Sequence, residues 1–222
     1  MVKKKEKKVS EEKPVVIHPI IKKRVLVEIG GDGGSLILNQ KTAKMEYDIA
    51  AKEGGKAHLK KGPREPEKEY LASINTMSDG KTPAIKTHWI KAAMVRACAH
   101  VDGVTMTAAK QLFYVFGPEE DDHTRIIGKH NMHKALVNVG KFPNKGATMR
   151  YRGEFKKWKA TIVLEFWEQR ISLESLLNLL NIAGFACGLA EMRPEKTGMC
   201  HGVFKLLRVI GAKENNRRKK GG

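Results

Sequence analysis

Apolar and polar residues alternate, or β-branched residues cluster, in several short segments, which predicts β-strands. The first covers residues 20–30 (IIKKRVLVEIG), where β-branched side chains dominate and a glycine follows. Further strands are predicted for residues 111–117, 134–140, 147–153, 156–168, 185–191 and 201–210. Within 156–168 the alternation assigns one set of side chains to a single face of the strand: Trp158, Ala160, Ile162, Leu164 and Phe166.

Two longer segments carry apolar residues at helical spacing. The first is 83–101, where Pro83 suits the first helical turn. The second is 172–184, with Ser172 as the predicted N-cap and Gly184 as the residue that ends the helix. A shorter helix is predicted over 40–53. Residues 54–83 contain Gly, Pro, Lys and Glu with little periodicity, which predicts a long loop insertion.

The order of these elements is strand, helix, several strands, helix, strand. It favours an α+β fold in which helices cover one face of an antiparallel sheet, on a ferredoxin-like or RRM-like plan. We expect one such domain over residues 14–210, which includes the loop insertion. Basic, disordered tails are expected at residues 1–13 and 211–222.

The net charge narrows the range of possible functions. The 222 residues carry a formal net charge of +18, and because the two tails hold +3 and +4, the body keeps +11. Such an excess attracts polyanions, of which nucleic acid is the commonest, although an acidic membrane surface is the alternative. No apolar run approaches the roughly 18 residues of a membrane span. Without a secretory signal, and with three cysteines that lack CxxC spacing, the chain is expected in the cytoplasm.

Catalytic and metal-binding motifs are weak. Two histidines lie three residues apart at His130 and His133, and Cys200 precedes His201, but neither pair belongs to a known ligand set. We therefore predict no metal and no cofactor. The segment GGDGG (30–34) resembles half of a phosphate-binding loop, but no Lys-Ser/Thr follows it, so a tight turn is the alternative interpretation.

The segment MRYRGEFKKWK (149–159) mixes cations with aromatic rings. Cations suit phosphates and rings suit bases, a combination that favours single-stranded nucleic acid. The alternative is that the rings are core residues beneath a basic surface. The aromatic residues are Tyr151, Phe155 and Trp158, and the cations are Arg150, Arg152, Lys156, Lys157 and Lys159.

Residues 184–206 (GFACGLAEMRPEKTGMCHGVFKL) predict a hairpin with a basic tip. Arg193 and Lys196 supply fixed cations there, and Gly198 and Gly202 leave room for a sugar-phosphate backbone to approach closely. An ordinary charged hairpin is the alternative.

These residues resemble the glycine-rich, basic hairpin of the RAMP superfamily, which includes the backbone subunits of CRISPR effector complexes, and also the ends of some phage-encoded proteins. The segment TPAIKTHWIKAAMVRAC (82–98) is similar to the entry to the first helix of that superfamily, where Lys86 and Arg96 occupy the basic positions. Thr87 stands where the superfamily often has glycine, and Cys200 and His201 replace small or aromatic residues.

The resemblance implies an RRM-like palm that holds guide RNA without sequence preference and stacks with its neighbours into a filament. It also implies that some members cleave RNA with one aspartate, for which Asp32 is the candidate here. We predict a non-enzymatic binder of RNA or single-stranded DNA that forms homo-oligomers along the strand. The alternatives are a metal-dependent ribonuclease that uses Asp32 or a histidine, and a phage structural or interaction protein. The predicted contacts are Lys86, Arg96, Arg150, Arg152, Lys156, Lys157, Lys159, Arg193, Lys196, Gly198 and Gly202.

Overall fold

A six-stranded antiparallel sheet forms the centre of the molecule. The computed structural model describes residues 19–39, 65–119, 121–139 and 146–213. The strands lie in the order β3-β5-β8-β1-β9. Strand β4 pairs with the same edge of β8 as β5 does, but farther along β8. Their bounds are β1 (Lys22–Gly31), β3 (Ala84–Lys86), β4 (Phe113–Phe116), β5 (His123–Ile127), β8 (Lys159–Trp167) and β9 (Phe204–Lys213).

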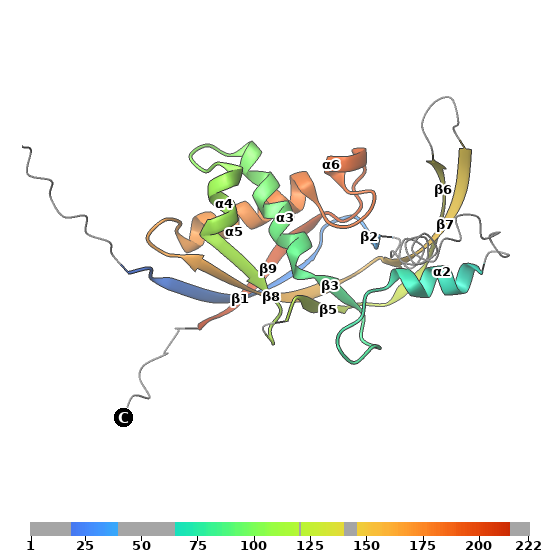
Figure 1. Cartoon of the computed structure of the whole chain (residues 1–222), viewed down its shortest axis with the longest axis horizontal. Helices are drawn as coiled ribbons and strands as arrows, with labels where there is room; N and C mark the ends of the chain where they lie inside the picture. Colours follow the sequence, from blue (N-terminus) through green and yellow to red (C-terminus); the bar gives the residue numbers. More distant parts are fainter. Residues whose placement is uncertain (1–18, 40–64, 120, 140–145, 214–222) are drawn as a thin grey trace, which may run out of the picture.

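A second, three-stranded sheet projects from one end of the first (Figure 1). It consists of β2 (Leu36–Ile37), β7 (Gly146–Phe155) and β6 (His130–Val139), in that order. The helix α2 (Pro66–Ser73) packs on it: Tyr70 is buried, and the Ser73 hydroxyl accepts a hydrogen bond of 2.7 Å from the Gly153 N–H.

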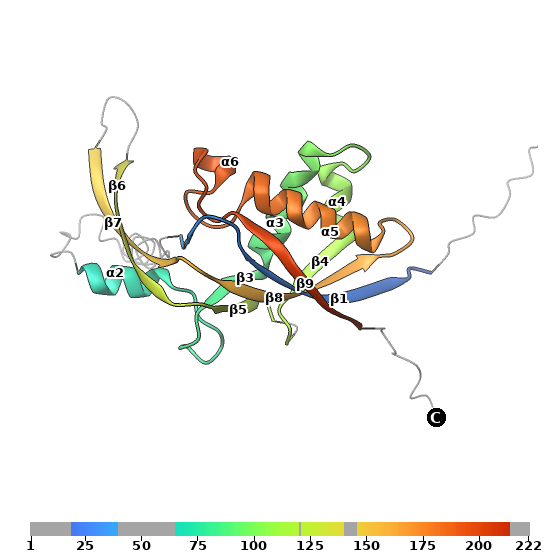
Figure 2. The same ribbon diagram turned by 180° about the vertical axis from the view of Figure 1, so that it is seen from behind.

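The remaining helices cover one face of the main sheet, as Figures 1 and 2 show from opposite sides. Apolar side chains of β1, such as Val25, Val27 and Ile29, point toward them and are at most 1% exposed. The helices are α3 (Thr87–Ala97), the 3-10 turn η1 (Cys98–His100), α4 (Met106–Leu112), α5 (Leu173–Ile182), the π-helical turn η2 (Ala183–Cys187) and α6 (Pro194–Thr197).

The predicted α+β fold is confirmed. The path β1–α3–β4/β5–β8–α5–β9, with β1 and β8 in the middle of the sheet, is the ferredoxin-like plan. The face predicted for residues 156–168 is also confirmed, since all five of its side chains are at most 3% exposed. A two-residue period fixes this face because successive side chains of a strand point to opposite sides.

Other boundaries differ from the prediction. Residues 66–73, predicted as loop, form α2, and residues 84–86, predicted as the start of a helix, form β3. Helix α4 and strand β5, of seven and five residues, were not predicted. Such short elements give few periods to detect. The helix predicted over 40–53 lies outside the described residues.

The predicted strand over 185–191 is wrong. The chain leaves α5 through η2 and ends its helical path at Gly188, whose φ is +65°. Gly184 therefore does not terminate the helix. Glycine is needed at position 184 for a different reason: a Cβ there would lie 1.8 Å from the Phe204 carbonyl oxygen. Without a strand before residue 191, the predicted hairpin does not form.

Ser172 caps α5, as its position predicted. Its hydroxyl accepts a hydrogen bond of 3.1 Å from the Ser175 N–H. We expect Ser172→Ala to destabilise the protein by about 1 kcal/mol, which a thermal melt would register as a fall of about 2–4 °C. Ser172→Asp keeps an acceptor and should melt close to the wild type. Equal losses in both variants would contradict the capping role.

Candidate nucleic-acid interface

Residues 188–203 form a loop, called here the glycine loop, that joins η2 to β9. Backbone hydrogen bonds fix it to itself and to the chain around β2. Within the loop the Leu189 N–H donates to the Gly202 carbonyl at 2.9 Å. The loop is anchored by Gly202, whose N–H donates to the Ser35 carbonyl, and by Glu191, whose N–H donates to the Ile37 carbonyl, both at 2.9 Å. The loop is thus held rigidly at one end of the main sheet.

Two residues of the glycine loop are strained. Ala190 and Met192 have φ values of +61° and +57°, in the left-handed region that residues other than glycine rarely adopt. Conformations of this kind cost about 1–3 kcal/mol each and are retained where the surroundings fix them. Together they determine the direction in which the intervening residue, Glu191, presents its side chain.

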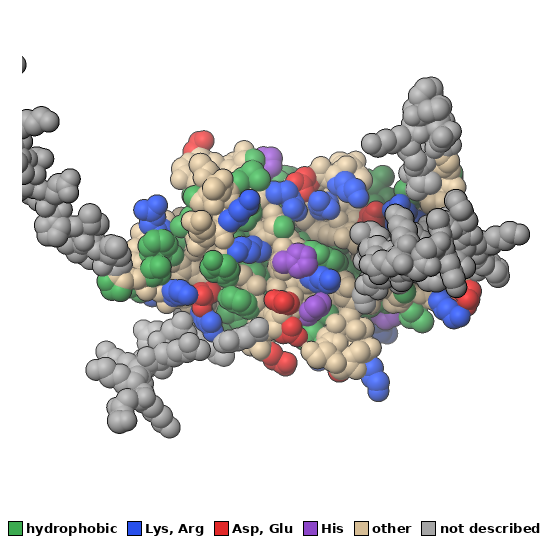
Figure 3. Space-filling model, viewed as in Figure 1, with side chains coloured by type: hydrophobic (Ala, Val, Ile, Leu, Met, Phe, Trp, Pro, Cys, Tyr) green, Lys and Arg blue, Asp and Glu red, His purple; other side chains and the backbone are tan. Residues whose placement is uncertain are grey.

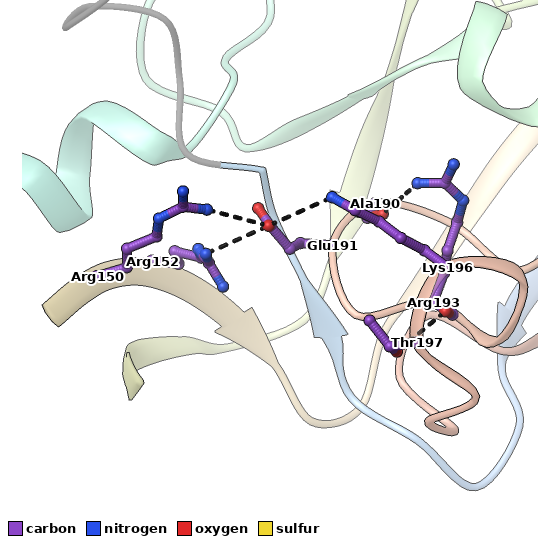
Figure 4. Close-up of polar contacts among 7 residues, drawn as sticks. All are labelled: Arg150, Arg152, Ala190, Glu191, Arg193, Lys196 and Thr197. Atoms are coloured by element: carbon purple, nitrogen blue, oxygen red, sulfur yellow. Dashed lines mark hydrogen bonds and ion pairs between the residues drawn. The ribbon is translucent and has the colours of Figure 1, made fainter. Parts of the chain in front are cut away.

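The Glu191 carboxylate gathers three cations (Figure 4). Its Oε1 lies 3.3 Å from Nη1 of Arg150, 3.3 Å from Nη2 of Arg152 and 3.7 Å from Nζ of Lys196. The two arginines come from β7 and the lysine from α6, so this carboxylate joins the second sheet to the glycine loop.

Arg152 corrects one predicted contact. The side chain was expected on the surface, but it is 1% exposed, and burial lowers the pKa of its guanidinium. Among the described residues none of its three guanidinium nitrogens has a hydrogen-bond partner. Arg152 is therefore held by the charge of Glu191 and does not reach a ligand on the surface.

A second carboxylate, Glu195, organises the other arginines. Its Oε2 lies 2.7 Å from Nε of Arg96 on α3 and 3.1 Å from Nε of Arg193. Arg193 also donates from Nη1 to the Ala190 carbonyl at 3.0 Å, which supports the strained backbone. Trp89, Arg96 and Arg193 contribute to the lining of a small cleft of about 90 Å³ between α3 and the glycine loop.

The arrangement leaves an excess of positive charge. Five cations surround two carboxylates, a local formal charge of +3, and Figure 3 shows Lys and Arg side chains gathered over α3 and α6. Lys86 lies apart from these pairs, at the residue that precedes α3. We call Arg96, Arg150, Arg152, Arg193 and Lys196, with Glu191 and Glu195, the arginine cluster.

The two glycines predicted as contacts differ from one another. Gly198 has a φ of +70°, and a Cβ there would meet nothing within 4 Å, so a ligand can approach its backbone. Gly202 has a φ of +72°, and its Cβ would lie 2.0 Å from the Leu189 carbonyl oxygen. The structure therefore gives Gly202 a packing role inside the loop.

The predicted lysines of segment 149–159 lie elsewhere. Lys156 and Lys157 form the turn before β8, and Lys159 begins that strand. The rings expected to stack on bases are buried, since Phe155 is 0% and Trp158 3% exposed. For these two rings the core interpretation is therefore correct. Tyr151 is half-buried against the core.

Asp32, the candidate for RNA cleavage, is paired with a lysine at the surface. Its carboxylate forms an ion pair of 2.8 Å with Lys205 and is 47% exposed. Across the described part of the chain no group of three or more His, Cys, Asp or Glu side chains is placed to hold a metal ion. Among the same residues, no helix has the length and apolar character needed to cross a membrane.

The sequence pattern did not predict the two carboxylates that organise the arginine cluster, Glu191 and Glu195. Glu191 fell in the predicted strand 185–191, and Glu195 fell in the turn after it. Glu191 is distinguished by the positive φ values of its two neighbours, Ala190 and Met192. No sequence pattern predicts positive φ for residues of these types. The Arg-Pro-Glu order at 193–195, with proline opening α6, was the available signal for Glu195.

Comparison with known proteins adds a likeness of fold. A chain of the cryo-EM structure of the type III-B Cmr-beta bound to cognate target RNA matches with a TM-score of 0.51 and 11% sequence identity. The match covers 87% of this chain but only 61% of that chain. A chain of a CRISPR RNA-guided surveillance complex matches with a TM-score of 0.33 and 7% identity, over 82% of this chain and 66% of that one. No protein-family model and no curated protein matches. The first likeness shows that this chain shares the fold of that Cmr-beta chain.

Proposed function

We propose that this protein binds single-stranded RNA, without cleaving it, as a RAMP-like subunit of a CRISPR-like ribonucleoprotein in which several copies lie along one strand. The observation that carries the proposal is the arginine cluster. It gathers a formal charge of +3 where α3 and β7 meet a glycine loop whose backbone is hydrogen-bonded in place. Fixed cations of this kind suit the phosphates of a nucleic acid.

Two further observations support RNA held by its backbone. The aromatic rings of Phe155 and Trp158 are buried, which leaves phosphate contacts rather than base stacking as the main source of affinity. Phosphate contacts position a strand without reading its sequence. The neighbour of shared fold comes from a complex bound to RNA, which favours RNA over DNA.

The first test removes two cations of the arginine cluster. Arg193→Ala with Lys196→Ala should weaken binding of a labelled single-stranded RNA and lower the slope of log affinity against log salt by about 1.4, roughly 0.7 for each lost phosphate contact. Fluorescence anisotropy over a salt series measures both quantities. The melting temperature should fall by only a few degrees, because Arg193 gives up one neutral-acceptor hydrogen bond and exposed ion pairs contribute little.

The matched control is Lys68→Ala with Lys110→Ala, which removes the same charge from exposed positions of α2 and α4. Its salt slope should stay near that of the wild type. An equal fall in slope for the two double variants would mean that the protein binds RNA through its overall charge, and the assignment to the arginine cluster would be wrong.

A further inference from the structure

A second basic site lies where β1 ends and β8 begins, and it joins two sequence motifs that are 120 residues apart. The glycines of segment 30–34 and the lysines of turn 156–159 line a cavity of about 600 Å³, together with Ile127 and Leu207. A volume of this size falls in the range of small-molecule sites. Each motif alone was a weak signal, but here they share one site, called the lysine pocket.

The charges around the lysine pocket are unbalanced. Glu28 is 6% exposed and is already paired, with Arg208 at 2.5 Å and Lys159 at 3.5 Å. Burial raises the pKa of Glu28, but Arg208 and Lys159 outweigh burial and hold it below its usual value. Asp32 is paired with Lys205. No carboxylate of the described residues forms an ion pair with Lys156 or Lys157, whose charges thus remain for a ligand.

The Trp158 indole packs against the glycine turn, and its N–H is closed off from the cavity. Trp158 is 3% exposed, and among the described residues its buried Nε1–H has no hydrogen-bond acceptor. The indole lies against the glycine turn, since a Cβ on Gly31 would be 2.7 Å from Nε1. Gly33, at φ +83°, has open space around its Cβ position, so a ligand can approach the backbone there.

We propose that the lysine pocket binds a phosphate group, which Lys156 and Lys157 attract by charge beside the open backbone of Gly33. Two cations that have no carboxylate partner among the described residues, set beside open glycine backbone, fit an anion rich in acceptor oxygens. The phosphate has two possible sources, the backbone of an RNA strand or a free nucleotide. Only the RNA source rests on the function proposed above.

Nuclear magnetic resonance of the full-length, ¹⁵N-labelled protein separates the possibilities. Inorganic phosphate, AMP and a short single-stranded oligouridylate are titrated separately while the indole N–H signals are followed. Trp158 reports on the lysine pocket and Trp89 on the cleft beside the arginine cluster, whereas Trp167 already donates to Gln169 at 2.5 Å and serves as the reference. We expect the Trp158 signal to move with inorganic phosphate. Movement with the oligouridylate but not AMP identifies RNA as the source, and the reverse identifies a nucleotide.

Variants check that the shift reports binding at this site. Lys156→Ala with Lys157→Ala should weaken phosphate binding about tenfold, the loss of roughly one charge-assisted hydrogen bond. The control Lys68→Ala with Lys110→Ala should bind like the wild type.

Two results would overturn the lysine pocket. The first is a Trp158 signal that stays still with all three probes. The second is an equal shift in the wild type and in the Lys156/Lys157 double variant. Suppose that the oligouridylate shifts the Trp89 signal, while the Trp158 signal stays unchanged with all three probes. RNA binding at the arginine cluster is then supported, and the lysine pocket is rejected. The two proposals can therefore fail separately.

Discussion

Gly202→Val is expected to lower the melting temperature of the protein by about 10 °C or more. A Cβ at this position would lie 2.0 Å from the Leu189 carbonyl oxygen, and 2.9 and 3.0 Å from that residue's carbonyl carbon and amide nitrogen. These are backbone atoms and cannot rotate away. The φ of +72° adds strain for a β-branched residue. We expect a loss of more than about 4 kcal/mol, at the upper end for single substitutions, and each kcal/mol lowers the melting temperature by about 2–4 °C.

Gly33→Val is the matched control for Gly202→Val. Gly33 has a similar φ of +83°, but its Cβ would meet nothing within 4 Å. This variant should lose only the conformational term, about 1 kcal/mol. Thermal melts of the two variants therefore separate the clash from the backbone strain. Similar losses for both would show that the close approach of Gly202 to Leu189 is not what makes the glycine necessary.

Glu191→Ala is expected to destabilise the protein by about 3–5 kcal/mol, because it leaves a buried cation without its counter-charge. Arg150 and Lys196 are partly exposed and can turn to water once Glu191 is gone. Arg152 cannot, because its side chain is 1% exposed and its nitrogens lack other hydrogen-bond partners among the described residues. Chemical denaturation measured by circular dichroism gives the free energy of unfolding.

A double variant tests this explanation. Arg152→Met replaces the buried cation with an apolar side chain of similar length, and alone it should stay within about 1 kcal/mol of the wild type, since Glu191 keeps two other partners. Combined with Glu191→Ala it should recover most of the lost stability. If the double variant is as unstable as Glu191→Ala alone, the carboxylate stabilises the loop by another route, such as fixing the strained residues on either side.

Local periodicity was enough to predict the central elements. The buried face of 156–168 and the cap at Ser172 follow from rules that act over a few residues, and both are present. The same rules wrongly predicted a strand over residues 185–191. Its apolar composition resembles a buried strand, but a π-helical turn and three left-handed residues, Gly188, Ala190 and Met192, bend the chain instead. Tertiary contacts with Ser35 and Ile37 hold that path, and no local pattern encodes them.

The candidate site was predicted residue by residue but not as an arrangement. Segment 149–159 was predicted to present its basic side chains to one ligand. Instead, strand β7 takes Arg152 into the interior, and the following turn carries Lys156 and Lys157 to another site. Sequence spacing cannot tell which basic side chains share a ligand, because that depends on how β7, the glycine loop and the end of β1 meet. The carboxylates that pair with these cations come from distant segments for the same reason.

The turn that carries the lysine pocket also connects the two sheets. The chain passes from the main sheet to the projecting one at residues 128–129, between β5 and β6, and returns at 156–158, between β7 and β8. The two crossings touch, since a Cβ on Gly128 would lie 2.4 Å from the Lys157 carbonyl oxygen. We therefore expect a ligand that shifts the lysine turn to move the β6–β7 hairpin as well. Coupling between two binding sites is reciprocal. If a ligand in the pocket changes the affinity of the hairpin for a partner, that partner changes the affinity of the pocket for the ligand by the same factor.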